Sequence, residues 1–170
     1  VSYSEEINPD ILVIGARHLE GLEKAIFGSV NQPVLEKASA PVLLVPANAK
    51  YGEDDFKILY ATDFKTKDQQ AISKLLEFAH LLNAKVHCVH FDLDGFVNID
   101  RADMEEIERL FEAEREAGKI DFQILSSESF EEGINQYIKD RSIDLVAMLT
   151  QKRNFFESLL QSSKTKSMAS

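Results

Sequence analysis

Residues Asp10 to Pro46 read DILVIGARHLEGLEKAIFGSVNQPVLEKASAPVLLVP, and this stretch decides the expected fold. Ile11 to Ile14 is a short aliphatic run, which is typical of a strand buried on both faces of a parallel sheet. Gly15 ends the run and permits a sharp turn. A polar loop and a helical pattern follow, and Val42 to Val45 forms a second aliphatic run. The stretch therefore predicts a strand–helix–strand unit, the parallel crossover.

The loop of this unit carries residue types that suit a phosphate group. Gly28 lies thirteen residues after Gly15, and Ser29 comes next, at the expected start of the helix. Glycines leave backbone N–H groups uncovered, Ser29 can cap the helix, and the positive end of the helix dipole favours an anion. A tight turn followed by a capped helix with no ligand fits the same residues equally well, because short glycine motifs are hypotheses.

Composition and charge limit the class of protein. The 170 residues, 44% hydrophobic and 28% charged, suit one large or two small globular domains. The net charge of −10 argues against sequence-independent nucleic-acid binding and against adhesion to an anionic membrane. No run is long enough to span a bilayer, no signal peptide opens the chain, and the single Cys88 fits a reducing compartment. We therefore expect a cytoplasmic protein.

Strand and helix patterns alternate through the rest of the chain. The expected strands are 57–63, 85–91, 120–125 and 143–148, and the expected helices are 67–82, 102–117, 129–141 and 154–169. This alternation predicts an α/β fold with a doubly wound parallel sheet and right-handed crossovers.

A weak internal repeat predicts the domain organisation. DILVIG, residues 10–15, aligns with DLVAML, residues 144–149. The chain is therefore expected to be a segment of a longer protein that has two similar domains in tandem. Residues 1–47 are expected to be the C-terminal third of a first domain, 48–56 a linker, and 57–170 a second domain that lacks its last strand.

The loop that begins at Gly15 resembles the universal stress protein family. Nucleotide-binding members carry Gly-x2-Gly-x9-Gly-Ser/Thr between the fourth strand and the last helix. Gly15, Gly28 and Ser29 match the first glycine, the third glycine and the serine, and His18 stands in the place of the second glycine. The resemblance implies a phosphate site at these four residues, with the His18 side chain where the family brings backbone to phosphate.

Residues 57–91 are similar to the opening strand, first helix and second strand of the same family. Asp63 matches the acidic residue that binds the adenine end of the nucleotide in that family. Leu149, Lys152 and Ser162 stand where this second domain would have its three glycines, so we expect no intact phosphate loop there. The base-binding and phosphate-binding candidates of the chain would then belong to different sites of the intact tandem protein.

The family resemblance also implies an architecture and a role. It implies a Rossmann-like doubly wound sheet of strand order 3-2-1-4-5, dimers or tandem pseudo-dimers joined through the last strand, and a cytoplasmic stress response. ATP is bound by only some members. We expect Val42 to Val45 to lie at a sheet edge and to pair across an interface, because unpaired apolar edges invite pairing.

The expected function is that of a non-catalytic stress-response protein with weak binding of ATP or AMP. We expect no metal site beyond the Mg²⁺ that accompanies a nucleotide. His87 and His90, three apart on a strand, should face opposite sides, and Cys88 should be a buried thiol. Two alternatives stay open: a purely structural or interaction module without a ligand, and a nucleotide hydrolase or nucleotidyl transferase with Mg²⁺-dependent turnover.

Overall fold

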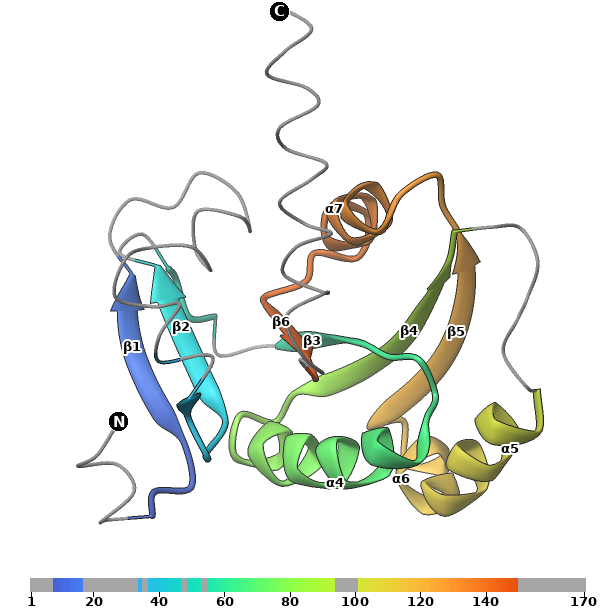
Figure 1. Cartoon of the computed structure of the whole chain (residues 1–170), viewed down its shortest axis with the longest axis horizontal. Coiled ribbons are helices and arrows are strands. Elements are labelled where there is room, and N and C mark those ends of the chain that lie inside the picture. Colours follow the sequence, from blue (N-terminus) through green and yellow to red (C-terminus); the bar gives the residue numbers. More distant parts are fainter. Residues whose placement is uncertain are drawn as a thin grey trace, which may run out of the picture. The chain divides into compact units, whose positions relative to one another are not determined.

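The computed structural model of the chain describes residues 8–16, 34, 37–46, 49–52, 55–93 and 101–149. These residues belong to two compact units that divide between Lys50 and Tyr51. Each unit contains a parallel sheet (Figure 1), so the expected α/β class is confirmed. None of the described helices is long and apolar enough to cross a membrane.

The first unit contains two parallel strands, β1 (Leu12–Ala16) and β2 (Val42–Pro46). Their parallel pairing is the one that the strand–helix–strand unit predicted, and Val34 and Lys37 within the connection are helical. Within the described residues of this unit β2 pairs only with β1. Pairing of its other edge across an interface stays a prediction.

Gly15 does not make the sharp turn that a glycine permits at this position. It lies inside β1 opposite Val45, and the ladder continues to Ala16, which pairs with Pro46. Its φ is not positive, because the ladder keeps the backbone extended past the end of the aliphatic run. His18, Gly28 and Ser29 lie outside the described residues.

The second unit is a four-stranded sheet with helices on both faces (Figure 1). Its elements are β3 (Lys57–Ala61), α4 (Thr66–Leu81), β4 (Lys85–Asp92), α5 (Arg101–Leu110), α6 (Glu112–Glu116), β5 (Ile120–Ser126), α7 (Phe130–Arg141) and β6 (Leu145–Met148). All neighbouring strands are parallel, in the order β5-β4-β3-β6. Counted within the unit this order is 3-2-1-4, and the complete order 3-2-1-4-5 stays a prediction.

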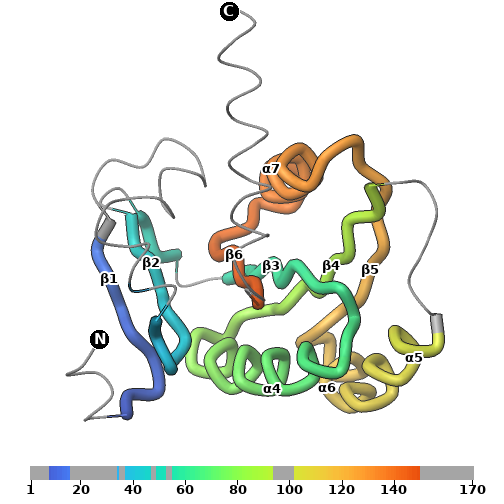
Figure 2. The backbone as a smooth tube through the Cα atoms, viewed as in Figure 1, coloured from blue at the N-terminus to red at the C-terminus, as the bar shows by residue number. Residues whose placement is uncertain are grey.

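Alternate residues of β4 point to opposite layers of this unit. Val86 and Cys88 belong to the main core with Ile72 of α4 and Ile107 of α5, all at most 1% exposed. His87 and Phe91 face α7 instead, where His87 contacts Tyr137 and Phe91 contacts Phe130. The tube in Figure 2 shows α4, α5 and α6 on one side of the strands and α7 on the other. The expected burial of Cys88 is confirmed.

The single helix expected over residues 102–117 is two helices. The break falls at Phe111, whose ψ of 27° departs from helical geometry. Phe111 is 7% exposed and belongs to the same core cluster as Ile107. We attribute the break to this packing, which tertiary contacts impose on a sequence of good helix formers.

Candidate functional site

The carboxyl ends of β3 and β6 form the candidate site. Strand order reverses between these two strands, since β4 follows β3 on one side and β6 lies on its other side. In open α/β sheets, ligands bind at such a switch point, outside the carboxyl ends of the strands. Ala61 pairs with Met148 as the last pair of the two strands. The residues that follow them, Thr62 and Asp63 after β3 and Leu149 after β6, therefore border this place.

Asp63 presents an open carboxylate at the switch point. Its side chain is 71% exposed, and its Oδ1 lies 3.8 Å from His90 Nδ1. His90 Nδ1 is also 2.9 Å from the carbonyl oxygen of Thr62. A carbonyl oxygen can only accept, so Nδ1 carries the hydrogen, and a neutral ring keeps its lone pair on Nε2. Asp63 thus offers carboxylate oxygens to a ligand, and His90 holds the loop beside it.

The Asp68 carboxylate fixes the loop that carries Asp63. Asp68 is 4% exposed and accepts three hydrogen bonds. The donors are the hydroxyl of Tyr60 at 2.7 Å, the hydroxyl of Thr62 at 2.9 Å and the backbone N–H of Lys65 at 3.0 Å. Burial raises the pKa of Tyr60, and its bond to Asp68 raises it further, so this phenol stays a donor. The strand, the loop and the start of α4 therefore share one buried acceptor.

Phe64 holds the same loop from the apolar side. It is completely buried, and its ring contacts Phe122 and His90, with centroids 6.2 and 6.3 Å away. Its φ of +53° lies in the left-handed region, which bulky residues rarely adopt. The backbone N–H of Phe64 donates to the Thr62 hydroxyl at 2.9 Å. Core packing and hydrogen bonds together hold this unusual backbone and leave Asp63 facing solvent.

A second polar cluster lies on the α7 face of the sheet. Asp121 of β5 accepts from His87 Nδ1, Lys85 Nζ and Gln123 Nε2 at 3.0, 3.0 and 3.1 Å. Burial alone would raise the pKa of Asp121, but hydrogen bonds and charge from His87 and Lys85 outweigh it and lower the pKa to about 2. Asp121 is therefore an anion at neutral pH. His87 and His90 face opposite sides of the sheet, as the sequence predicted.

The pKa of Asp121 predicts a specific acid response. The pKa of the Asp121 carboxyl falls from 3.8 to about 2 on folding. Such a carboxyl stabilises the fold at pH values above its unfolded pKa, and this stabilisation is lost as the pH falls through its folded pKa. We expect Asp121→Asn to lower the free energy of unfolding by about 1–2 kcal/mol at pH 7, allowing for its partial exposure. Urea unfolding from pH 7 to pH 3 should show this difference shrinking below about pH 4.

Asp55→Asn is the control for this prediction. Asp55 is exposed, and its φ of +60° is one that asparagine adopts readily. Its substitution should change stability by less than about 0.5 kcal/mol at each pH. If the difference in unfolding free energy between Asp121→Asn and the unchanged protein stayed constant from pH 7 to pH 3, the assigned role of the Asp121 charge would be contradicted.

The structure brings only part of the predicted site together. Asp63 follows β3 and borders the switch point of the second unit. Gly15 lies in a strand of the first unit, and His18, Gly28 and Ser29 are outside the described residues. No three potential metal ligands cluster within the described ranges. Asp68 was not among the predicted site residues. Its sequence signal is an acidic residue at the third position of a helix, where the side chain can accept a hydrogen bond from the backbone N–H of the N-cap residue.

A family sequence model and solved structures resemble this chain. The model of the universal stress protein family matches residues 1–46 and 56–170. A universal stress protein structure from Archaeoglobus fulgidus DSM 4304 is 22% identical, with a TM-score of 0.64, over 86% of this chain and 51% of that one. The chain thus spans about half the length of that protein, and at this identity the likeness shows the fold. No curated protein matches the chain.

Two further structures are more distant. A universal stress protein in complex with cAMP is 16% identical, with a TM-score of 0.39 over 54% of this chain and 70% of that one. A member of the family from Burkholderia pseudomallei is 21% identical, with a TM-score of 0.43 over 63% of this chain and 89% of that one. At these TM-scores neither structure bears on the ligand of this chain.

Proposed function

Because the chain belongs to the universal stress protein family, we propose that it is a non-catalytic stress-response protein that binds an adenine nucleotide weakly beside Asp63. The supporting observation is the Asp63 carboxylate, which is 71% exposed and borders the switch point of the sheet. Its oxygens can accept hydrogen bonds from the amino group of adenine or from ribose hydroxyls. The bonds to Asp68 and the burial of Phe64 hold the loop in place before a ligand arrives.

The proposed binding is weak because the described residues of the second unit offer little to the phosphates. Leu149, 40% exposed, follows β6 at the place where the family's glycine loop would approach a phosphate. Asp63 itself repels phosphate charge, and the net charge of the chain is −10. We expect the nucleoside part to supply most of the affinity, so adenosine, AMP and ATP should bind alike. A phosphate site at Gly15, His18, Gly28 and Ser29 would be a separate site.

The test is a thermal-shift titration with adenosine, AMP, ATP and GTP. At ten times Kd the stabilisation should be about 1.4 kcal/mol. Asp63→Asn should weaken the binding of the adenine ligands about tenfold, because a hydrogen bond to a charged acceptor contributes about 1–1.5 kcal/mol more than one to a neutral acceptor. Asp55→Asn is the matched control, since Asp55 precedes β3 and Asp63 follows it, so the two lie toward opposite ends of one strand.

Other results would select the alternatives. No shift with any ligand at millimolar concentration would favour a structural or interaction module. Mg²⁺-dependent release of phosphate from ATP, lost in Asp63→Asn and retained in Asp55→Asn, would instead favour a hydrolase. A shift with all nucleotides that Asp63→Asn leaves unchanged would place the ligand elsewhere in the chain.

A further inference from the structure

Strand β5 leaves one edge of the four-stranded sheet unpaired within the described residues. It is the outermost strand in the order β5-β4-β3-β6, and its strand partner there is β4 (Figure 1). The N–H of Ser127 donates to the carbonyl of Asp92 on β4 at 3.0 Å. Successive residues of a strand direct their backbone groups to opposite sides, so those of Phe122 and Ile124 point away from β4. Such a row of free N–H and C=O groups is a template for another strand.

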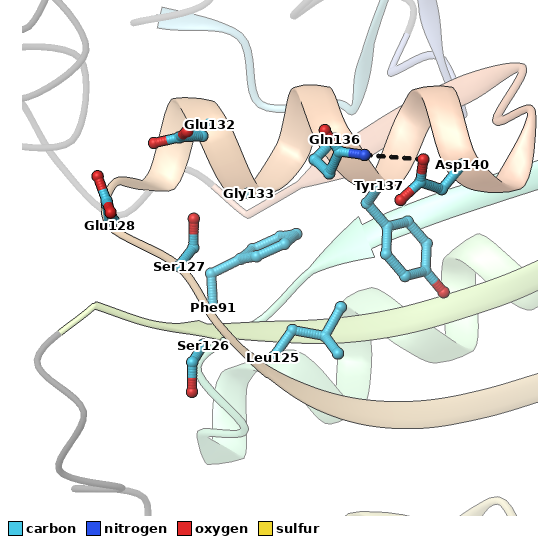
Figure 3. A pocket seen from close by; sticks show the side chains of 10 residues that line it. All are labelled: Phe91, Leu125, Ser126, Ser127, Glu128, Glu132, Gly133, Gln136, Tyr137 and Asp140. Atoms are coloured by element: carbon cyan, nitrogen blue, oxygen red, sulfur yellow. Dashed lines mark hydrogen bonds between the residues drawn. The ribbon is translucent and has the colours of Figure 1, made fainter.

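A groove of about 360 Å³ lies beside this edge, between α7 and the carboxyl ends of β4 and β5. Its floor is apolar, and Figure 3 shows the side chains of Phe91, Leu125 and Tyr137 lying between α7 and the strands. Leu125 belongs to β5 itself, so the groove reaches the edge strand. Sites for small ligands have volumes of about 300–1,000 Å³. This groove therefore accepts a few side chains of a partner and not a folded domain.

Carboxylates line the rim of this groove. Glu128, Glu132 and Asp140 are exposed lining residues, and none of the described lining residues is a lysine or an arginine. Glu128 and Glu132 form no ion pair with a described residue. Arg141 lies over the Tyr137 ring at 5.8 Å and adds one positive charge near the end of α7. Glu132 and Asp140 lie about 12 Å apart along the helix axis, so the rim suits a partner with repeated positive charges.

A second copy of this chain fits the edge poorly. If β5 paired with β5, both strands would bring the same carboxylates to the contact, and each chain carries a net charge of −10. Like charges placed opposite each other oppose association. The charge of the rim therefore favours a basic partner of different sequence, and binding should weaken as the salt concentration rises.

We propose that β5 and this groove bind an extended basic segment of a partner protein by strand addition. The backbone of the segment pairs with the open edge of β5, which supplies the main-chain hydrogen bonds of such complexes. Alternate side chains of the segment turn to the α7 face. There the stems of lysine or arginine cover Leu125 and Tyr137, and their charged ends reach Glu128 and Glu132. The intervening side chains lie beside the partly buried Phe122 on the other face, which favours apolar residues at those positions.

Fluorescence anisotropy with a labelled peptide of alternating lysine and valine tests the charge of the site. Glu128→Gln combined with Glu132→Gln should weaken binding about tenfold, because an exposed ion pair is worth up to about fivefold in affinity. Glu105→Gln combined with Glu106→Gln, on the exposed side of α5, removes the same charge elsewhere and should change affinity less than about twofold. Equal weakening by the two double variants would overturn the proposal. So would equal binding of a glutamate–valine peptide, or no binding at millimolar lysine–valine peptide.

Two further measurements test the strand pairing itself. A lysine–valine peptide that is N-methylated at alternate residues keeps its charges but loses the hydrogen bonds to the edge, so it should bind about tenfold more weakly. Amide hydrogen exchange should slow at Phe122 and Ile124 when the unmodified peptide binds, and not at Gln123, whose N–H faces β4. Equal binding of the N-methylated peptide, or unchanged exchange at Phe122 and Ile124, would overturn strand addition. Slow exchange there without peptide, lost on dilution, would assign the edge to a second copy instead.

Discussion

Asp68→Ala should lower the free energy of unfolding by about 3–5 kcal/mol, because it removes the acceptor of three buried hydrogen bonds. The hydroxyls of Tyr60 and Thr62 and the N–H of Lys65 would all lose their partner. Tyr60 is 2% exposed and Thr62 is 6% exposed, so water cannot easily replace the carboxylate. Such a loss is a large part of the 5–15 kcal/mol that stabilises a typical domain. Urea unfolding followed by circular dichroism measures it.

Two further variants sharpen this prediction. Asp68→Asn keeps one carbonyl acceptor of similar shape, so it should be less damaging than Asp68→Ala. Glu105→Ala, on the exposed side of α5, should change stability by less than about 0.5 kcal/mol. If Asp68→Ala were no more damaging than Glu105→Ala, the loop after β3 would not depend on the Asp68 carboxylate.

Phe64→Ala should lower the free energy of unfolding by about 3–5 kcal/mol, the usual range for removing a fully buried phenylalanine. The ring is completely buried between Phe122 and His90, and its loss leaves a cavity at the start of α4. Because the same ring holds the loop of Asp63, the variant should also weaken ligand binding at that edge. Urea unfolding gives the stability, and the nucleotide titration gives the affinity.

Phe64→Gly separates the effect of backbone conformation on stability from the effect of side-chain packing at this position. A non-glycine residue in the left-handed region is disfavoured by roughly 1 kcal/mol, and glycine is not. With φ at +53°, Phe64→Gly should therefore be at least as stable as Phe64→Ala, the reverse of the order in a helix. If glycine proved less stable than alanine here, the left-handed backbone of residue 64 would be in question.

Much of the fold follows from pattern alone. The aliphatic runs from Lys57, Lys85 and Ile120 form parallel strands, and helical periodicity places α4 and α7 to within a residue or two. These patterns succeed because a strand covered on both faces needs an apolar side chain at nearly every position, and a covering helix needs one every three or four. Asp63 was also predicted, since the end of the first strand fixes its place at the sheet edge.

The failures have a physical cause in long-range contacts. The sequence ended the first strand before Gly15, where a sharp turn is possible, but pairing with β2 continues β1 to Ala16. It predicted one helix over 102–117, but core packing interrupts the helix at Phe111. For His87 it predicted only the face of the sheet, whereas the structure gives it a partner in Asp121, thirty-four residues later on the neighbouring strand β5. Strand pairing and burial, which set these outcomes, involve residues far apart in the chain.

By itself the sequence determined the family, the parallel α/β class and the position of Asp63, because local periodicity and short motifs encode strands, helices and loop ends. Only the tertiary structure decided how Asp63 is held. The three bonds to Asp68 and the burial of Phe64 depend on β3, the loop and α4 folding against one core. It likewise decided the partners of Asp121, because a buried polar group is defined by what folds around it.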